Sequence, residues 1–202
     1  MPLFLPSRRT LLAVTTAAAF SSLLAGCQPA DTPAQFSGSD ISDTNVGNEL
    51  SMVDTQGTTR TLADFKGKVT VFFFGFTQCP DVCPTAMAEL SQMVTLLGDQ
   101  ADQVQVAMIS VDPERDTPEI LGQYVHTFNP GFIGLTGSLD QLEATARSFK
   151  AYYAKVKGAK PGEYSMDHAS SFYIFDKNAK ARVLVSGKAP AADIAADIRK
   201  LL

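Results

Sequence analysis

The sequence has few of the residues that usually carry metal or redox chemistry, with three cysteines and two histidines among its 202 residues. It also has no excess of basic residues, since its formal net charge is −4 and its pI is near 5.1. Lys and Arg are interspersed with Asp and Glu, so the basic stripe that follows a phosphate backbone is missing. We therefore expect no nucleic-acid partner. Because internal repeats and low-complexity tracts are also missing, the length and ordinary composition predict one globular domain.

The N-terminal segment has the order of an export signal. Arg8 and Arg9 precede the apolar stretch Thr10–Phe20, and small residues follow up to Cys27. The stretch is too short for a comfortable transmembrane helix. Residues 24–27 resemble a bacterial lipobox, in which the cysteine is acylated after cleavage. We expect residues 1–26 to be a lipoprotein signal peptide, Cys27 to carry the lipid, and the exported chain to lie on the periplasmic side of a bacterial membrane. A plain secretory signal with a free Cys27 is the alternative.

Residues 27–48 are expected to form a lipidated tether. This segment is rich in Pro, Ser, Thr, Gly and Asp, a composition typical of flexible linkers. Its apolar residues Phe36, Ile41 and Val46 are candidates for packing against the domain. We place the folded domain at residues 49–202.

Within the domain, strand and helix patterns alternate. The expected elements are a hairpin (50–53 and 58–62), a strand buried on both faces (69–76), a helix (84–97), a second buried strand (104–111), a helix (118–128), a short strand (132–135), a helix (139–149), a short strand (152–156), a polar loop (157–167), a hairpin (171–175 and 182–185) and an amphipathic helix (190–201). This order predicts a three-layer α/β fold with a central mixed sheet and an N-terminal hairpin. A cysteine pair at the carboxyl end of a central strand, at the start of the next helix, is the thioredoxin-like arrangement.

Cys79 and Cys83 form the most informative motif, Cys79-Pro80-Asp81-Val82-Cys83-Pro84. Two thiols four residues apart at the start of a helix lie on one face, one turn apart. The positive end of the helix favours thiolate over thiol. The motif therefore indicates either binding of a soft metal or cycling between dithiol and disulfide.

Three segments together resemble the Sco/SenC family: residues 76–84 (Phe-Thr-Gln-Cys-Pro-Asp-Val-Cys-Pro), residues 110–118 (Ser-Val-Asp-Pro-Glu-Arg-Asp-Thr-Pro) and Asp167-His168. The resemblance implies a thioredoxin-like fold and a copper metallochaperone rather than an enzyme. Its partner would be the copper-bearing subunit of cytochrome c oxidase, whose dinuclear copper centre this family supplies, or another periplasmic copper protein. The family's copper ligands carry over to Cys79, Cys83 and His168.

The chemistry of these residues agrees with copper. Thiolates select Cu(I), and imidazole accommodates both Cu(I) and Cu(II). His168 is expected on the loop before the strand 171–175, which a thioredoxin-like fold places beside the cysteine turn, and Asp167 is a candidate acceptor that would orient its ring.

Other polar and sulfur-bearing residues are expected to have ordinary structural roles. We expect His126 at the surface or in a groove, Met87 and Met93 in the core, and Met166 in loop packing. Asp112 and Asp116 are expected to be capping and turn residues.

Two other functions remain open. A thiol–disulfide oxidoreductase could keep copper-site cysteines of a partner reduced, although three residues separate these thiols instead of two and residues 168–171 contain no proline. A peroxidase of the peroxiredoxin class needs Thr or Ser three residues before its reactive cysteine, where this chain has Phe76 and Pro80. The three-residue spacing and the missing proline both favour metal binding over the thiol–disulfide oxidoreductase, but they do not exclude redox activity.

Overall fold

The computed structural model describes residues 35–202. The expected signal peptide (1–26) and the expected lipid site at Cys27 lie outside these residues. Within the described part, none of the helices combines the length and the apolar character needed to cross a membrane.

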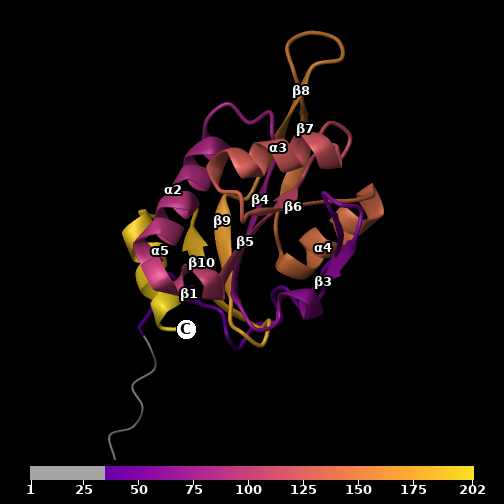
Figure 1. Ribbon diagram of the computed structural model, residues 1–202. Helices are drawn as coiled ribbons and strands as arrows, with labels where there is room; N and C mark the ends of the chain where they lie inside the picture. Colours follow the sequence, from indigo (N-terminus) through magenta and orange to yellow (C-terminus); the bar gives the residue numbers. More distant parts are fainter. Residues whose placement is uncertain (1–34) are drawn as a thin grey trace, which may run out of the picture. The chain divides into compact units, whose positions relative to one another are not determined.

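The described chain folds around an eight-stranded sheet with the strand order β1-β10-β9-β4-β5-β6-β2-β3 (Figure 1). Its strands are β1 (Ser39–Asp40), β2 (Ser51–Asp54), β3 (Thr59–Thr61), β4 (Val69–Gly75), β5 (Val104–Ser110), β6 (Ile133–Thr136), β9 (Ser171–Phe175) and β10 (Ala181–Ser186). β4 pairs parallel with β5 and antiparallel with β9, which confirms the expected mixed sheet. Every residue of β4 is buried, as its continuous apolar sequence predicts for a central strand.

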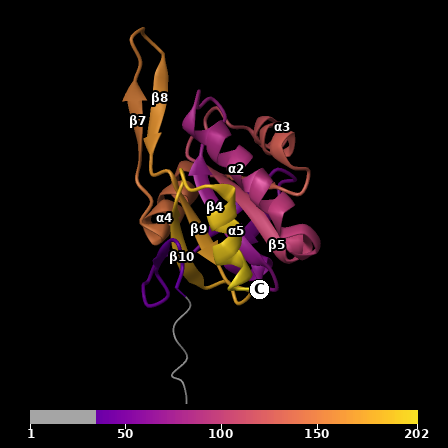
Figure 2. The same ribbon diagram turned by 90° about the vertical axis from the view of Figure 1, so that its left-hand side faces the viewer.

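Four α-helices and two short 3-10 helices complete the described fold: η1 (Leu62–Phe65), α2 (Val82–Leu97), η2 (Gly98–Gln103), α3 (Pro118–Phe128), α4 (Leu139–Phe149) and α5 (Ala191–Arg199). α2 and α5 lie side by side on one face of the sheet (Figures 1 and 2), where the Ala191 N–H donates to the Glu89 carboxylate at 2.7 Å. α4 covers the opposite face. The predicted three-layer, thioredoxin-like architecture is therefore confirmed.

An aromatic cluster holds α4 to the sheet. The ring centroid of Phe149 lies 5.4–5.5 Å from four other rings, those of Phe72, Phe74, Tyr173 and Phe175. Because successive strand residues point to opposite faces, Phe73 and Gly75 of β4 face α2 instead. The strand that precedes the cysteine motif is thus packed from both sides.

Residues 36–48 correct the expected extent of the tether. β1 pairs with β10, Ile41 is buried, and the backbone N–H groups of Ser37 and Gly38 donate to the carboxylate of Asp197 at 2.8 and 2.9 Å. The folded unit begins at Phe36, earlier than the expected boundary at residue 49. The composition of this segment is typical of a flexible linker. Its backbone groups nevertheless pair with residues more than 100 positions away, and composition carries no information on such distant partners.

A second hairpin takes up five of the eleven residues of the expected polar loop over 157–167, and its first strand corresponds to the short strand expected over 152–156. β7 (Tyr153–Lys157) and β8 (Tyr164–His168) pair antiparallel in a two-stranded sheet of their own. They extend beyond the body of the fold in Figure 2. None of their residues is fully buried. β8 nevertheless alternates between partly buried and exposed residues, and this five-residue period-2 pattern is the signal that could have predicted the strand.

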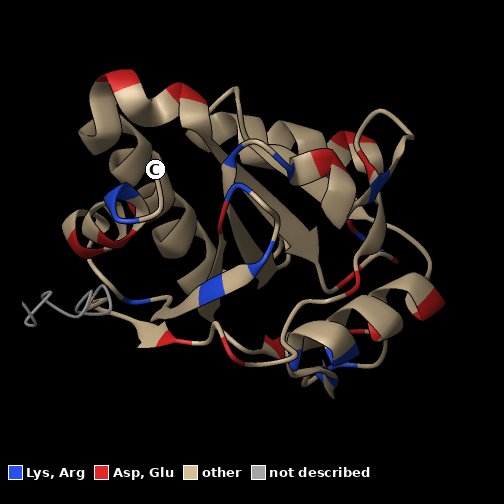
Figure 3. Cartoon of the chain, turned by 90° about the horizontal axis from the view of Figure 1, so that it is seen from below, with Lys and Arg blue, Asp and Glu red and all other residues tan. Residues whose placement is uncertain are grey.

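Charged residues of both signs are interspersed on the surface. On the face seen in Figure 3, Lys and Arg lie among Asp and Glu without gathering in a region of one sign.

Candidate metal centre

The cysteine turn links the end of β4 to the start of α2. The Cys79 N–H donates to the Phe76 carbonyl at 3.3 Å, and the Cys83 N–H donates to Cys79 Sγ at 3.4 Å. Cys79 precedes the helix, and Asp81, at the N-cap, makes no side-chain cap bond. The Cys79 sulfur therefore accepts one of the unpaired N–H groups of the first turn and lies at the positive end of α2.

Cys83 lies beneath this turn and is fully buried. Burial raises the pKa of its thiol, and the neighbouring Cys79 raises it further. Gly75 makes room for the sulfur, because a Cβ at residue 75 would lie 3.1 Å from Cys83 Sγ and 2.8 Å from a ring carbon of Phe73. Both cysteines are free thiols.

His168 reaches the sulfur pair from the end of β8. Its Nε2 lies 3.3 Å from Cys83 Sγ, and its Nδ1 lies 3.1 Å from the Ala169 carbonyl oxygen. Burial lowers the pKa of His168, so the neutral ring is favoured at neutral pH. Donation from Nδ1–H to the Ala169 carbonyl leaves the lone pair of Nε2 facing the thiols, which is the state a metal ligand needs.

Asp167 is expected to orient the His168 ring, but in the structure the backbone carbonyl of Ala169 does so. The Asp167 side chain is exposed, and the backbone carbonyl next to His168 faces Nδ1 instead. Asp167 acts on the ring through its charge, which opposes the lowering of the pKa of His168. The physical reason is strand geometry, since neighbouring residues of β8 point to opposite faces.

The three candidate ligand atoms all lie within 4.8 Å of one another. An ion about 2.3 Å from each ligand in a trigonal site needs them about 4 Å apart, so small side-chain adjustments would suffice. A hollow of about 170 Å³ opens beside them. Cys79 and His168 line it and are partly exposed, whereas Cys83 lies behind.

The other sequence candidates lie where they were expected. His126 is exposed on α3, and Met87 and Met93 are buried in the core. Met166 is half-buried against the core at the edge of the hollow.

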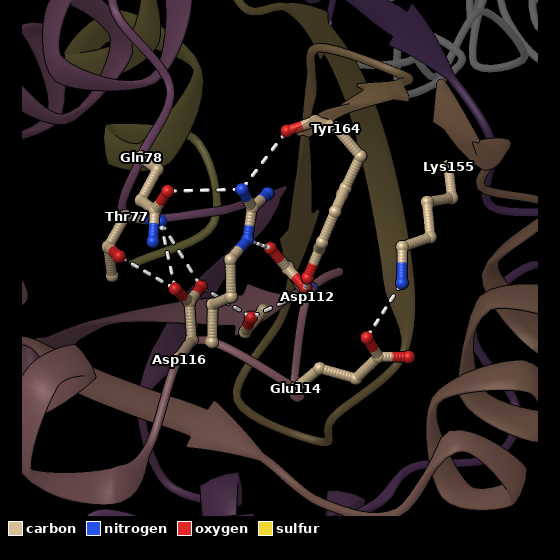
Figure 4. Close-up of polar contacts among 9 residues, drawn as sticks. Thr77, Gln78, Asp112, Glu114, Asp116, Lys155 and Tyr164 are labelled. Carbon is tan, nitrogen blue, oxygen red and sulfur yellow. Dashed lines mark hydrogen bonds and ion pairs between the residues drawn. The ribbon is translucent and has the colours of Figure 1, made fainter. Parts of the chain in front are cut away.

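The loop after β5 differs from the expectation of ordinary turn residues. Asp112 and Asp116 are buried, with exposed fractions of 3% and 0%. Asp116 accepts hydrogen bonds from Thr77 N (3.1 Å), Thr77 Oγ1 (2.6 Å) and Ser110 Oγ (2.6 Å), as Figure 4 shows. Burial raises the pKa of Asp116, although these hydrogen bonds oppose the rise. The carboxylate thus fixes the backbone two residues before Cys79.

Arg115 and Tyr164 are residues of this region that the sequence reasoning missed. The signal that could have found Arg115 is topological, because the loops after two parallel neighbouring strands meet at one edge of a sheet. Tyr164 lies at the start of β8, and the signal that could have found it is the alternation of partly buried and exposed residues along that strand.

The fold and the site define a class of protein: a thioredoxin-like domain with a Cys-Cys-His cluster at the end of its central strand. A sequence model of the SCO1/SenC family matches residues 38–202. The chain therefore belongs to the SCO1/SenC family.

Known relatives agree with this assignment. A SCO2-like protein of Rickettsia felis is 36% identical over 136 residues, which are 67% of this chain and 66% of that relative. The structure of Bradyrhizobium japonicum ScoI with copper bound has 36% identity and a TM-score of 0.72, covering 78% of this chain and 99% of that one.

Two further solved structures are similar. A SCO1/SenC family lipoprotein from Bacillus anthracis has 29% identity and a TM-score of 0.66, covering 77% of this chain and 94% of that one. BsSco, described as a member of the Sco family of cytochrome c oxidase assembly proteins with a disulfide switch, has 28% identity and a TM-score of 0.61, covering 77% and 92%.

Proposed function

We propose that this chain is a copper metallochaperone that binds one copper ion through Cys79 Sγ, Cys83 Sγ and His168 Nε2. The observation that carries the proposal is the convergence of three ligand atoms within 4.8 Å from a turn, a helix and a separate hairpin. Membership of the SCO1/SenC family and the copper-bound relative support it. The acceptor is the copper-bearing subunit of cytochrome c oxidase or another periplasmic copper protein, as the assembly role of BsSco suggests.

The donor set suits a cargo that must be held and then released. Two sulfurs bind Cu(I) tightly, and the imidazole extends the site to Cu(II). Binding displaces the proton of the buried Cys83 thiol, so copper affinity is expected to rise with pH. The partly exposed Cys79 and His168 at the hollow provide the side from which an acceptor's ligands can approach.

The chain is proposed to act on the periplasmic side of a bacterial membrane, attached by a lipid on Cys27. The lipobox-like residues before Cys27 support this, and one similar structure is of a family lipoprotein. In bacteria that express the full chain, Cys27→Ser should abolish incorporation of labelled fatty acid and release the protein from the membrane fraction. Unchanged lipid labelling would contradict the anchor.

The decisive test is copper titration of the reduced domain with single-residue variants. His168→Ala should weaken Cu(II) binding by at least about tenfold and Cu(I) binding less, because two thiolates still satisfy the softer ion. Cys83→Ser should weaken both. His126→Ala is the matched control, since His126 is an exposed histidine on α3 and outside the cluster. Unchanged Cu(II) absorption in His168→Ala would refute the ligand assignment.

A thiol–disulfide oxidoreductase is the second candidate. Cys79 and Cys83 are both free thiols with their sulfurs within 4.8 Å, and BsSco is described with a disulfide switch. The two functions separate in His168→Ala. A reductase should keep reducing a cysteine pair on the acceptor after this substitution, whereas a copper chaperone should lose delivery of Cu(II).

A further inference from the structure

The β7–β8 hairpin carries His168 and is only partly held by the hydrophobic core. Tyr153 and Met166 pack against the core, and the His168 ring lies edge-on to Phe73 and Phe76, with centroid distances of 6.1 and 5.8 Å. None of the strand residues is fully buried, however, and the hairpin forms a sheet separate from the central one, projecting beyond the helices in Figures 1 and 2. The distance from the imidazole to the thiols is therefore set by polar contacts of the hairpin as well as by this packing.

Arg115 supplies such contacts by joining the two halves of the metal site. Its Nη1 donates to the Gln78 side-chain oxygen at 3.0 Å, next to Cys79, and to the Tyr164 carbonyl at 3.1 Å, at the start of β8. Its Nε donates to the buried carboxylate of Asp112. One guanidinium thus bridges the cysteine turn and the hairpin.

Tyr164 completes the connection. Its ring lies under the Arg115 guanidinium, with 3.7 Å from Cζ to the ring centroid, and its hydroxyl donates to Asp112 Oδ1 at 2.9 Å. Lys155 Nζ lies 3.9 Å from the same centroid and pairs with Glu114 at 2.7 Å. Two cations this close to one ring centroid must lie on opposite faces of the ring, and Figure 4 shows Lys155 beside Tyr164.

We propose that Arg115 and Tyr164 are positioning residues that hold the His168 hairpin against the cysteine turn and thereby set the strength of Cu(II) binding. The inference rests on the proposed copper function and specifies how one of its three ligands is held. Cu(II) is the sensitive ion because it depends on the imidazole more than Cu(I) does.

The contacts of Arg115 and Tyr164 can hold the hairpin in a fixed position relative to the cysteine turn. The Asp112 side chain is 3% exposed and the Arg115 side chain 22%, so solvent screens their pairing less than it screens a surface ion pair. Stacking a cation on an aromatic ring adds to this when water is excluded. Because the hairpin contributes no fully buried strand residue, losing the contacts should loosen the hairpin without unfolding the domain.

The experiment compares Arg115→Met with a matched control, Arg60→Met. Arg60 also pairs through Nε with a buried carboxylate, Asp54, and the side chains are 31% and 4% exposed. It lies on the edge strand β3, four strands away from β4, which leads into the cysteine turn. Hydrogen exchange of the metal-free reduced protein and affinities for Cu(I) and Cu(II) are measured for both variants and for wild type.

Arg115→Met should speed exchange of the β7–β8 amides on the order of tenfold, with β4 and β5 unchanged. It should weaken Cu(II) binding about tenfold, with a smaller effect on Cu(I). Arg60→Met should change neither. A parallel pair keeps the idea testable if Arg115→Met folds poorly: Tyr164→Phe retains the ring and should have a smaller effect than Tyr164→Ala.

Wild-type hairpin exchange and an unchanged ratio of Cu(II) to Cu(I) affinity in both Arg115→Met and Tyr164→Ala would overturn the proposal. An equal loss of both ions would also overturn it, because that pattern indicates a general structural defect. If the wild-type domain itself binds no copper, the proposed function fails instead. In that case hydrogen exchange of the metal-free protein still shows whether Arg115 and Tyr164 hold the hairpin in place.

Discussion

Replacing Gly75 by alanine tests how tightly Cys83 is packed against the central strand. An added Cβ would lie 2.8 Å from a Phe73 ring carbon, 3.1 Å from Cys83 Sγ and 3.1 Å from the Met108 methyl carbon. These separations are shorter than ordinary contacts between carbon atoms or between carbon and sulfur. The sulfur and its neighbours must therefore move by a few tenths of an ångström.

The expected size of the effect follows from two opposing contributions. Overpacking a core by one methyl group typically destabilises a fold by about 1–3 kcal/mol, and replacing glycine in a strand recovers roughly 0.5–1 kcal/mol. We expect Gly75→Ala to lower the free energy of unfolding by about 1–2 kcal/mol. Because Cys83 Sγ is displaced, the Cu(II) absorption band should also shift.

The measurement is urea unfolding of the reduced, metal-free domain, followed by Cu(II) spectra of the folded protein. Gly122→Ala is the control, because the three atoms nearest to a Cβ at residue 122 of α3 all belong to Thr55 and lie 3.4–3.7 Å away. It should raise the free energy of unfolding by about 0.5–1 kcal/mol. If Gly75→Ala proves as stable as wild type with an unchanged Cu(II) spectrum, the close packing around Cys83 is refuted.

Two further predictions concern the scaffold. Phe149→Ala removes the centre of the aromatic cluster and should lower the free energy of unfolding by about 3–5 kcal/mol in a urea titration, with Cu(I) affinity of the folded protein unchanged; a loss below about 1 kcal/mol would contradict the packing. Burial alone would raise the pKa of Asp197, but the N–H groups of Ser37 and Gly38 and the Lys200 ammonium outweigh it and lower the pKa. Asp197→Ala should therefore destabilise the fold at pH 7 by about 1.5–3 kcal/mol. The difference from wild type should shrink as the pH falls below about 4, where the unfolded chain binds a proton that the folded carboxylate, with its lowered pKa, takes up only at still lower pH; a difference independent of pH would contradict this.

Local patterns predicted most of the central fold. The continuous apolar runs over 69–76 and 104–111 correspond to β4 and β5, and their parallel pairing follows from the helix between them. The helices were recovered within a few residues, because apolar periodicity and N-caps such as Thr117 and Ser138 are local signals. β7 corresponds to the short strand expected over 152–156, whereas β8 falls in the expected polar loop, because its five residues follow a Gly- and Pro-containing segment and none of them is fully buried.

The candidate ligands came from motif chemistry and from the family resemblance, and the structure brings Cys79, Cys83 and His168 together. The neighbours of the site were less predictable. Asp116 was interpreted as a turn residue because its spacing fits a turn, but it is buried beneath Thr77 from the cysteine turn. A carboxylate's burial depends on which loops the sheet brings to one edge, and spacing along the chain carries no such information.

Local patterns along the chain are enough to predict the alternation of strands and helices, the buried character of β4, and the pair of thiols at a helix start. The contact of His168 with Cys83 across 85 positions, and that of Arg115 with Tyr164 across 49, could be found only in the folded molecule. The spacing of apolar residues and the choice of turn residues depend on near neighbours in the chain. The approach of distant side chains depends instead on how the strand order and the crossover connections place their segments in space.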